Sequence, residues 1–406
     1  MTMANITGGT LLLPGAGEAA PGTVQIKGAN IAAIDAPSPA ENDIDASGLL
    51  VAPGIIDLGV FTTDKPAFKY GGITRAALMP DQTPVHDDPA TIRFAGLQGK
   101  PDHWVHPLAA ATQKLAGDSI AEIALMKEAG ALGVATGRRW IADSGLMLRL
   151  MRYCAMLDLP VIVHCEDGGL TNGAVATDGE TATRLGLPSA PALAESLAVS
   201  RDIALAKHSG ARVHFRQVTT ADALDLVRGA KSAGLPITCG ITPAHLLLCD
   251  DALSDYRTFA RFTPPLRGAP DRQACIAAIA DGTIDVISSG HAPQGPEAKR
   301  LPFAEAATGM AGAESLLALS LNFVRDGTIT MGRLFDLIAR NPARILGVNA
   351  GQITAGMEAD LILIDTEAPW QIDSAKMAAL AGNTPFDKLP VQGRVRKMIK
   401  GGKIIS

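Results

Sequence analysis

The sequence is poor in aromatic side chains, which make up only 4% of its 406 residues. We therefore expect a core built mostly from Ala, Val, Ile and Leu. No apolar run reaches the length of about 18 residues that a membrane-spanning helix needs, so the sequence predicts no such span. No basic stretch precedes the short apolar run near the first residues, and this pattern argues against a secretory signal.

Neither sign of charge is in large excess. The chain has 36 basic and 41 acidic residues and a formal net charge of -5. This balance lacks the basic footprint of proteins that bind nucleic acid or anionic membranes. The five cysteines are odd in number and form no C-x-x-C motif. Such cysteines are typical of reduced, mostly buried thiols, so we expect a cytoplasmic protein.

Apolar residues are abundant and recur in a regular order. Hydrophobic residues make up 47% of the chain and charged residues 19%, which is enough for a large core and excludes general disorder. Eight short runs of apolar, often β-branched residues follow one another at 55–60, 73–79, 104–108, 132–135, 161–164, 213–218, 237–241 and 284–288. We interpret each run as a buried strand.

Segments with the apolar spacing of helices separate many of these runs. They cover residues 119–129, 146–157, 221–233 and 272–280. Alternating strands and helices indicate an α/β protein with a parallel sheet. Eight strands at this spacing fit a (β/α)8 TIM-like barrel better than an open sheet.

The two ends of the chain have a different pattern. Residues 6–50 and 351–406 contain short strand-like runs broken by Gly and Pro turns. Neither segment is long enough to bury a core alone. We expect residues 1–52 and 351–406 to pair into one small β-sandwich, formed from both termini, beside a barrel made of residues 53–350.

Several motifs resemble those of the dihydroorotases in the amidohydrolase superfamily. They occur in the family's order and extend over nearly the whole chain, as VAPGIIDLGVF, GGITRAALMPDQTP, LPVIVHCED, FTPPLRGAPDRQ, SSGHAP and NPARILG. The resemblance implies a barrel of the amidohydrolase type with a terminal β-sandwich. It also implies hydrolysis at one or two divalent metals, which polarise a carbonyl and activate water, with an aspartate that handles the proton.

Most of the family's metal-binding positions hold no metal ligand in this chain. The family's first strand ends in His-x-His, which places two imidazoles on the inward face of that strand. The resemblance puts Gly59 and Phe61 at these positions. It puts Gln217 at the sixth-strand histidine and Gly290 at the eighth-strand aspartate. Only the fifth-strand histidine is retained, as His164.

The surrounding positions depart from the family pattern as well. The bridging carboxylate after the fourth strand falls at Thr136 or Gly137, neither of which is acidic. The resemblance places the remains of a substrate pocket at Thr63, Asp81, His291 and Gln294. A catalytic zinc normally needs three protein ligands and an open position. We therefore predict no catalytic residue, no metal site and no cofactor.

A rebuilt site around His164 is the main alternative. It would bind zinc with new partners, for which the candidates are His291, Cys165, Cys239 and Glu166. We expect the two cysteines to face the barrel mouth or its rim. A nucleophilic cysteine needs a base beside it. Cys165 and His164 are adjacent in sequence and so point to opposite faces of a strand, which makes this role unfavourable.

An arginine pair and a histidine near the strand ends also need an interpretation. Arg138 and Arg139 follow the fourth strand and could mark an anion site, although a solvated or ion-paired loop is the interpretation we favour. His86 resembles a surface residue.

The departures from the family pattern predict a catalytically inactive dihydroorotase homologue. Some bacterial aspartate transcarbamoylases resemble such an arrangement, in which an inactive dihydroorotase-like chain assembles with the catalytic chains. The resemblance implies a structural role in pyrimidine biosynthesis, with the aspartate transcarbamoylase catalytic chain as partner and a homodimer or higher oligomer of this chain. The alternative is a zinc-dependent dihydroorotase or related cyclic amidohydrolase with a rebuilt metal site.

Overall fold

The computed structural model describes residues 3–15, 17–35 and 43–405. The strands of its middle region are β6 (Ile55–Val60), β7 (Ile73–Leu78), β8 (Trp104–Pro107), β9 (Ala109–Ala110), β10 (Val134–Ala135), β11 (Val161–Val163), β14 (Val213–Phe215), β15 (Ile237–Ile241) and β16 (Val286–Ile287). They pair in parallel in the orders β6-β7-β8 and β9-β10-β11-β14-β15-β16. Each of the eight predicted runs contains one of these strands, and β9, which follows the third run directly, was not predicted.

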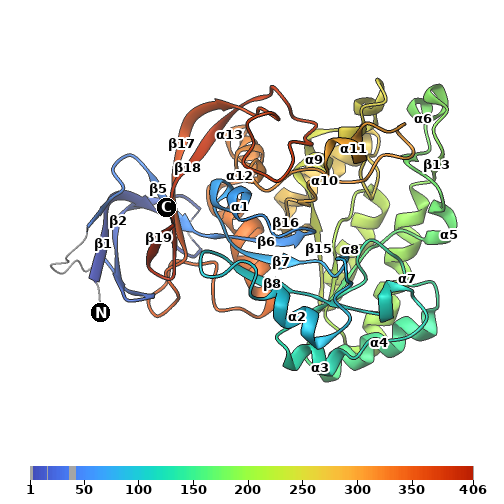
Figure 1. Ribbon diagram of the computed structural model, residues 1–406, viewed down its shortest axis with the longest axis horizontal. Coiled ribbons are helices and arrows are strands. Elements are labelled where there is room, and N and C mark those ends of the chain that lie inside the picture. The colour runs from blue at the N-terminus through green and yellow to red at the C-terminus, as the bar shows by residue number, and fades with distance from the viewer. Residues whose placement is uncertain (1–2, 16, 36–42, 406) are drawn as a thin grey trace.

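The two sheets close into a barrel. β8 and β9 follow one another along the chain, which joins the sheets on one side. On the other side, Phe61 N donates to His291 O (2.8 Å) and Ser289 N donates to Asp57 Oδ1 (3.1 Å). These contacts bring the first strand beside the last. The predicted α/β fold with a TIM-like barrel is therefore confirmed (Figure 1).

Helices surround the barrel strands. The long ones are α4 (Ser144–Met156), α7 (Leu193–Ser209), α8 (Ala221–Ser232) and α10 (Ala269–Asp281). The shorter ones are α1 (Lys65–Gly71), α2 (Pro89–Ala95), α3 (Ile123–Glu128), α5 (Gly168–Thr171), α6 (Glu180–Leu185), α9 (Pro243–Leu247), α11 (Pro296–Lys299), α12 (Leu316–Ser320), α13 (Asn322–Arg325), α14 (Met331–Phe335) and α15 (Asn341–Leu346). Single turns η1 (Gln113–Leu115), η2 (Asp250–Leu253), η3 (Thr258–Ala260) and η4 (Asp336–Arg340) and a two-stranded ladder of β12 (Ala176–Thr177) and β13 (Ser189–Ala190) complete the loops.

Local sequence signals fix the ends of the long helices. α4 begins after Asp143, whose Oδ1 accepts hydrogen bonds from Gly145 N (2.7 Å) and Leu146 N (3.1 Å). Such a cap satisfies main-chain donors that have no partner inside the helix. α7 ends at Gly210 with a φ of +71°, in the left-handed region that glycine adopts without strain.

Strands from both ends of the chain form the second unit. They are β1 (Met3–Leu11), β2 (Ala20–Lys27), β3 (Asn30–Ile34), β4 (Ile44–Asp45), β5 (Leu50–Pro53), β17 (Leu361–Gln371), β18 (Pro390–Lys400) and β19 (Lys403–Ile405). Their order is β19-β18-β17-β5-β1-β2-β3, with β4 paired to β1. Figure 1 shows these blue and red strands beside the barrel. The termini thus share one β-sheet domain, as predicted, in which a single continuous sheet encloses an apolar cluster.

A buried ion network joins the terminal sheet to the barrel. Arg75 in β7 donates from Nε to Asp360 Oδ2 (2.9 Å) and also pairs with Glu358 (2.5 Å). Lys400 at the end of β18 pairs with the same two carboxylates, at 2.9 Å from Asp360 and 2.5 Å from Glu358. Because each charge in this network has an opposite partner, its burial between the two units is compensated.

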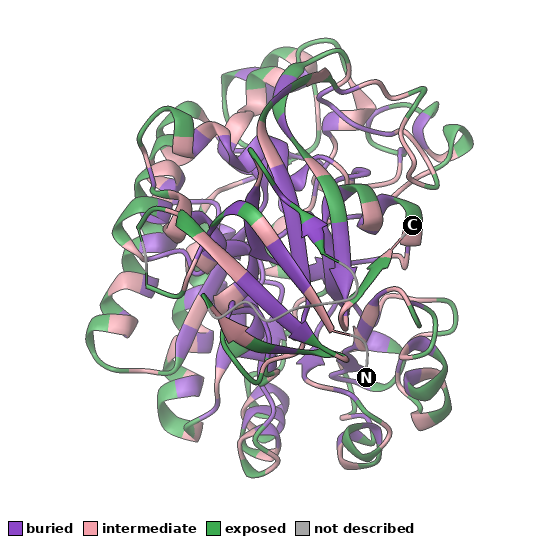
Figure 2. Ribbon diagram, turned by 90° about the vertical axis from the view of Figure 1, so that its left-hand side faces the viewer, coloured by how far each residue is buried: buried purple, intermediate pink, exposed green. Residues whose placement is uncertain are grey.

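The core has the composition that the sequence predicts. Its largest cluster of buried residues is dominated by Ala, Val, Ile and Leu. Figure 2 shows central strands that are mostly buried and outer helices that are partly exposed. Within residues 3–15, 17–35 and 43–405, no helix is both long and apolar enough to cross a membrane.

Candidate functional site

The carboxyl ends of the barrel strands form the mouth, where sites occur in this fold. Phe61 follows β6 there, Arg138 follows β10 and Arg216 follows β14. The guanidinium carbon of Arg138 lies 3.4 Å from the centre of the Phe61 ring, and that of Arg216 lies 5.3 Å from it. One aromatic ring and two cationic groups therefore occupy the mouth together, in cation–π contact.

Little space remains between these side chains. With Gln217, Ser289 and their neighbours they line a cavity of about 20 Å³, which is enough for about one water molecule. Pockets that hold small-molecule substrates usually have volumes of about 300–1,000 Å³. The mouth in this conformation does not have room for a cyclic amide substrate.

His164 follows β11, and both of its ring nitrogens already have polar neighbours. Arg216 Nη2 lies 3.4 Å from His164 Nδ1. Because a guanidinium group only donates, Nδ1 accepts and the ring proton belongs on Nε2. Nε2 faces Glu166 Oε2 at 3.4 Å, and the main-chain N–H of His164 donates to Thr136 Oγ1 (2.9 Å). A metal ion at Nδ1 would take the place of a cationic group and would be repelled by it.

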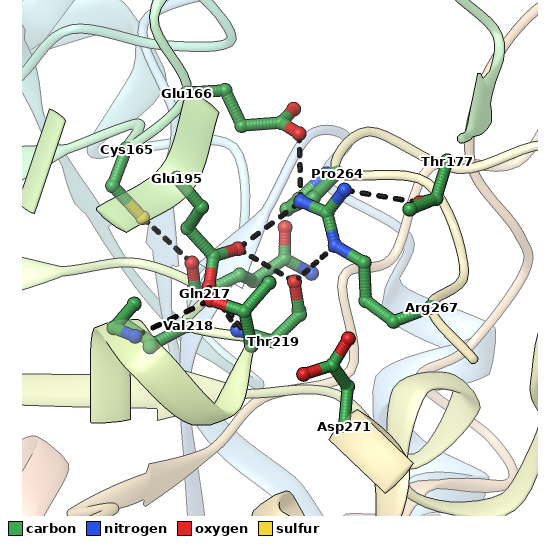
Figure 3. Close-up of polar contacts among 12 residues, drawn as sticks. Cys165, Glu166, Thr177, Glu195, Gln217, Val218, Thr219, Pro264, Arg267 and Asp271 are labelled. Atoms are coloured by element: carbon green, nitrogen blue, oxygen red, sulfur yellow. Dashed lines mark hydrogen bonds and ion pairs between the residues drawn. The ribbon is translucent and has the colours of Figure 1, made fainter. Parts of the chain in front are cut away.

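Glu166, which faces His164, belongs to a buried network of charged side chains around Arg267 (Figure 3). Arg267 Nη2 pairs with Glu166 Oε1 (2.8 Å) and with Glu195 Oε2 (3.3 Å). The other guanidinium nitrogens of Arg267 donate to Thr219 Oγ1 (2.9 Å) and Thr177 Oγ1 (3.0 Å). Burial alone would raise the pKa of Glu166, but its contacts with His164 and Arg267 outweigh that effect and lower the pKa to about 2. The network therefore holds the Glu166 carboxylate ionised.

The remaining family ligand positions supply no metal donor. A Cβ added at Gly59 would lie 3.3 Å from Ser288 Oγ, and one at Gly290 would lie 3.2 Å from a Thr242 methyl group. Gly290 has a φ of +61°, so a side chain there would also strain the main chain. Gln217 carries a neutral amide, whose Oε1 is buried without a hydrogen-bond partner.

These residues do not fit the divalent metal that the fold family implies. Across the ranges that the structure describes, no group of three or more His, Cys, Asp or Glu side chains is placed to hold a metal ion. The family's two first-strand ligand positions hold a glycine and the Phe61 ring, and Arg216 lies beside the retained His164. This donor set lacks the three ligands that a catalytic zinc needs.

The structure does not bring the candidates for a rebuilt site together. His291 Nε2 lies 3.3 Å from Asp64 Oδ2, so this histidine is paired away from His164. The thiols of Cys165 and Cys239 are fully buried and donate to main-chain carbonyl groups. Burial raises the pKa of both thiols well above the usual range. The expectation that the two cysteines face the mouth or its rim is therefore wrong.

The predicted substrate-pocket positions are also spread over separate contacts. Thr63 Oγ1 donates to Gln98 Oε1 (3.0 Å). Asp81 Oδ1 accepts from the main-chain N–H of Arg138 (2.9 Å) and so supports the loop after β10. Gln294 is tied through its main-chain N–H to the C-terminal segment. With the pairing of His291, each of the four positions thus has its own separate contact.

Arg216, a polar residue of the mouth, was not among the residues predicted from the sequence. A signal was present, because a single arginine interrupts the apolar run at 213–218, and a charge within a buried strand needs a specific partner or role. The surface assignment of His86 is wrong, since this side chain is only 5% exposed. Burial lowers the pKa of His86 to about 4.

Solved structures of other proteins share this architecture. L-hydantoinase (dihydropyrimidinase) from Arthrobacter aurescens matches with a TM-score of 0.88 at 23% identity, over 100% of this chain and 96% of that chain. Dihydropyrimidinase from Brevibacillus agri matches with a TM-score of 0.85 at 20% identity, over 99% and 95% of the two chains. At these identities the likeness shows the shared fold.

Sequence comparison gives the family. The amidohydrolase family model matches residues 84–405. A dihydroorotase from Geobacter metallireducens is 37% identical over 387 residues, which cover 92% of this chain and 91% of that protein. A dihydroorotase from Pelotomaculum thermopropionicum is 37% identical over 419 residues, with coverages of 98% and 97%. The chain belongs to the amidohydrolase family, among its dihydroorotase-like members.

Proposed function

We propose that this chain is a catalytically inactive dihydroorotase homologue that serves as a structural subunit of aspartate transcarbamoylase in pyrimidine biosynthesis. The observation that carries the proposal is the filled mouth. The Phe61 ring, with Arg138 and Arg216 against it, occupies the space in which a metal-activated water and a substrate would have to meet.

Metal-dependent hydrolysis has specific requirements that this mouth does not meet. Bound zinc lowers the pKa of water to about 7, whereas free water has a pKa near 15.7. One histidine beside a guanidinium group does not hold such an ion. At the family's proton-handling position, Gly290 offers no carboxylate. The changes at these positions therefore remove metal binding, water activation and proton transfer together.

The barrel itself is fully built although its mouth is filled. Its strands and long helices enclose a large apolar cluster, and the terminal sheet encloses another. A fold that persists without its chemistry can still act through its surface. This chain resembles the inactive dihydroorotase-like chains of bacterial aspartate transcarbamoylases, and the partner that we propose for its surface is therefore the aspartate transcarbamoylase catalytic chain. On this proposal the complex forms in the cytoplasm, and this chain is at least a dimer within it.

Co-expression with an aspartate transcarbamoylase catalytic chain, ideally from the same organism, tests the assembly role. Light scattering after size exclusion compares the mass of the transferase with and without this chain of 42.0 kDa. We expect a stable larger complex that contains both chains, with an interface above about 1,000 Å². A transferase whose mass and stability do not change in the presence of this chain contradicts the proposal.

A zinc-dependent dihydroorotase or related cyclic amidohydrolase is the second candidate. It is favoured by the names of the relatives, which are dihydroorotases at 37% identity. Its test is hydrolysis of dihydroorotate and of hydantoin by the chain with added zinc. Turnover that is lost in His164→Ala and kept in His208→Ala, a change at an exposed histidine, supports this candidate. The inactive-subunit proposal predicts no turnover in any of the three proteins.

A further inference from the structure

The barrel mouth holds a half-buried and a buried arginine, Arg138 and Arg216, that form no ion pair. In the part of the chain that the structure describes, neither Arg138 nor Arg216 forms an ion pair with a carboxylate. Arg216 is only 4% exposed, and its Nε is buried without a hydrogen-bond partner. Unpaired buried charge is costly, so a guanidinium pair of this kind calls for a counterion.

Lys299 adds positive charge near Arg138. Lys299 is 3% exposed and donates to two main-chain carbonyl groups, those of Thr258 (3.1 Å) and Ala307 (2.6 Å). Burial, followed by the nearby charges of Arg261 and Arg138, lowers the pKa of Lys299 to about 8. Positive charge near Arg138 is therefore not limited to the Arg216 guanidinium group.

Two acidic groups lie nearby, and neither forms an ion pair with these arginines. Asp81 attracts both arginines through space; its Oδ1 accepts from the main-chain N–H of Arg138, and its Oδ2 is buried without a hydrogen-bond partner. Glu166 pairs with Arg267 and faces His164. Neither carboxylate lines the cavity between Arg138 and Arg216. That cavity is bounded instead by guanidinium, hydroxyl and amide groups and by aromatic rings.

We propose that the barrel mouth binds a small monovalent anion, of the size of chloride or of a formate carboxylate, between the Arg138 and Arg216 guanidinium groups. The cavity of about 20 Å³ sets the size. The two arginines supply charge-assisted donors, and Ser289 and Thr308 line the same cavity. The site would hold an anion in a mouth where the family holds cations. This inference goes beyond the proposed assembly role and needs no partner chain.

A thermal-unfolding titration of the full chain tests the site. Sodium chloride, sodium formate and sodium gluconate are compared at equal ionic strength, because gluconate is too large for the cavity. For a chain of 406 residues, we expect a saturable rise in Tm of about 3 °C at an anion concentration one hundred times its Kd. A response to chloride alone assigns a halide site, and a response to formate, with or without chloride, assigns a site that accepts a carboxylate.

Variants and a second measurement make the test specific. Arg138→Gln should abolish the rise, whereas Arg139→Gln, a matched change at the exposed neighbour, should keep it. Crystals grown in bromide should show an anomalous peak between Arg138 and Arg216. An equal rise with gluconate, a rise that survives in Arg138→Gln, or no bromide peak at that place each overturn the proposal.

Discussion

Removing the positive charge from the buried network behind His164 should destabilise the whole barrel. In Arg267→Met, a side chain of similar length loses its contacts with Glu166, Glu195, Thr177 and Thr219. Glu166 and Glu195 are only 4% and 0% exposed, so both carboxylates would stay buried without their cation.

The magnitude follows from this burial. Breaking a buried ion pair by removing one partner typically costs about 3–5 kcal/mol. Unfolding entropy of about 2.1 cal/mol/K per residue gives about 0.85 kcal/mol per degree for 406 residues. We therefore expect Tm to fall by about 4–6 °C in Arg267→Met.

The assay is calorimetric or fluorescence-monitored thermal unfolding of the purified chain at pH 7. The matched control is Arg228→Met, which removes an arginine whose side chain is 43% exposed and whose partners are Asp225 and Asp281. Exposed pairs of this kind contribute about 0–1 kcal/mol, so the control should shift Tm by about 1 °C or less. An equal fall in Tm in Arg267→Met and Arg228→Met would show that the buried network does not stabilise the fold more than an exposed ion pair does.

Three other predictions concern acid stability, thiols and the mouth. The pKa of Glu166 is lowered to about 2 from its usual value of 4.5, so the stability that its ionised form contributes is complete above pH 4.5 and is lost as the pH falls toward 2. In denaturant titrations from pH 5 to 3, the free energy of unfolding should therefore fall less steeply in Glu166→Gln than in the unchanged chain. A thiol reagent should label only Cys249 among the five cysteines of the folded chain, since the other four are buried; fast labelling of a second thiol would contradict this. Phe61→Ala should lower the free energy of unfolding by about 3 kcal/mol without creating zinc binding, and zinc uptake by this variant would show that the ring alone blocks a usable site.

Much of the barrel could be predicted from the sequence because its strands are short apolar runs. β6 and β15 have the predicted bounds, and α8 differs from prediction by one residue at its end. The 17-residue helix α7 was not predicted. Its inward face carries Glu195 and Asp202, which are buried by pairing with arginines, so the apolar periodicity that marks a helix is broken there.

The missing metal ligands of the candidate site could be predicted from the sequence, but the contacts among the side chains that fill the mouth could not. A glycine at 59 and a phenylalanine at 61 can be read directly as missing ligands. The stacking of Arg138 and Arg216 on Phe61 joins three residues from distant strands, and no sequence spacing records such a contact. Burial of Cys165 depends in the same way on how its strand packs.

The zinc content of the purified chain tests the central claim most directly. The chain is expressed in zinc-supplemented cells, passed through size exclusion without chelator and measured by elemental analysis. A mouth filled by Phe61 and Arg216 beside His164 predicts far less than one zinc ion per chain. One tightly held ion per chain, lost in His164→Ala and kept in His208→Ala, would contradict the account.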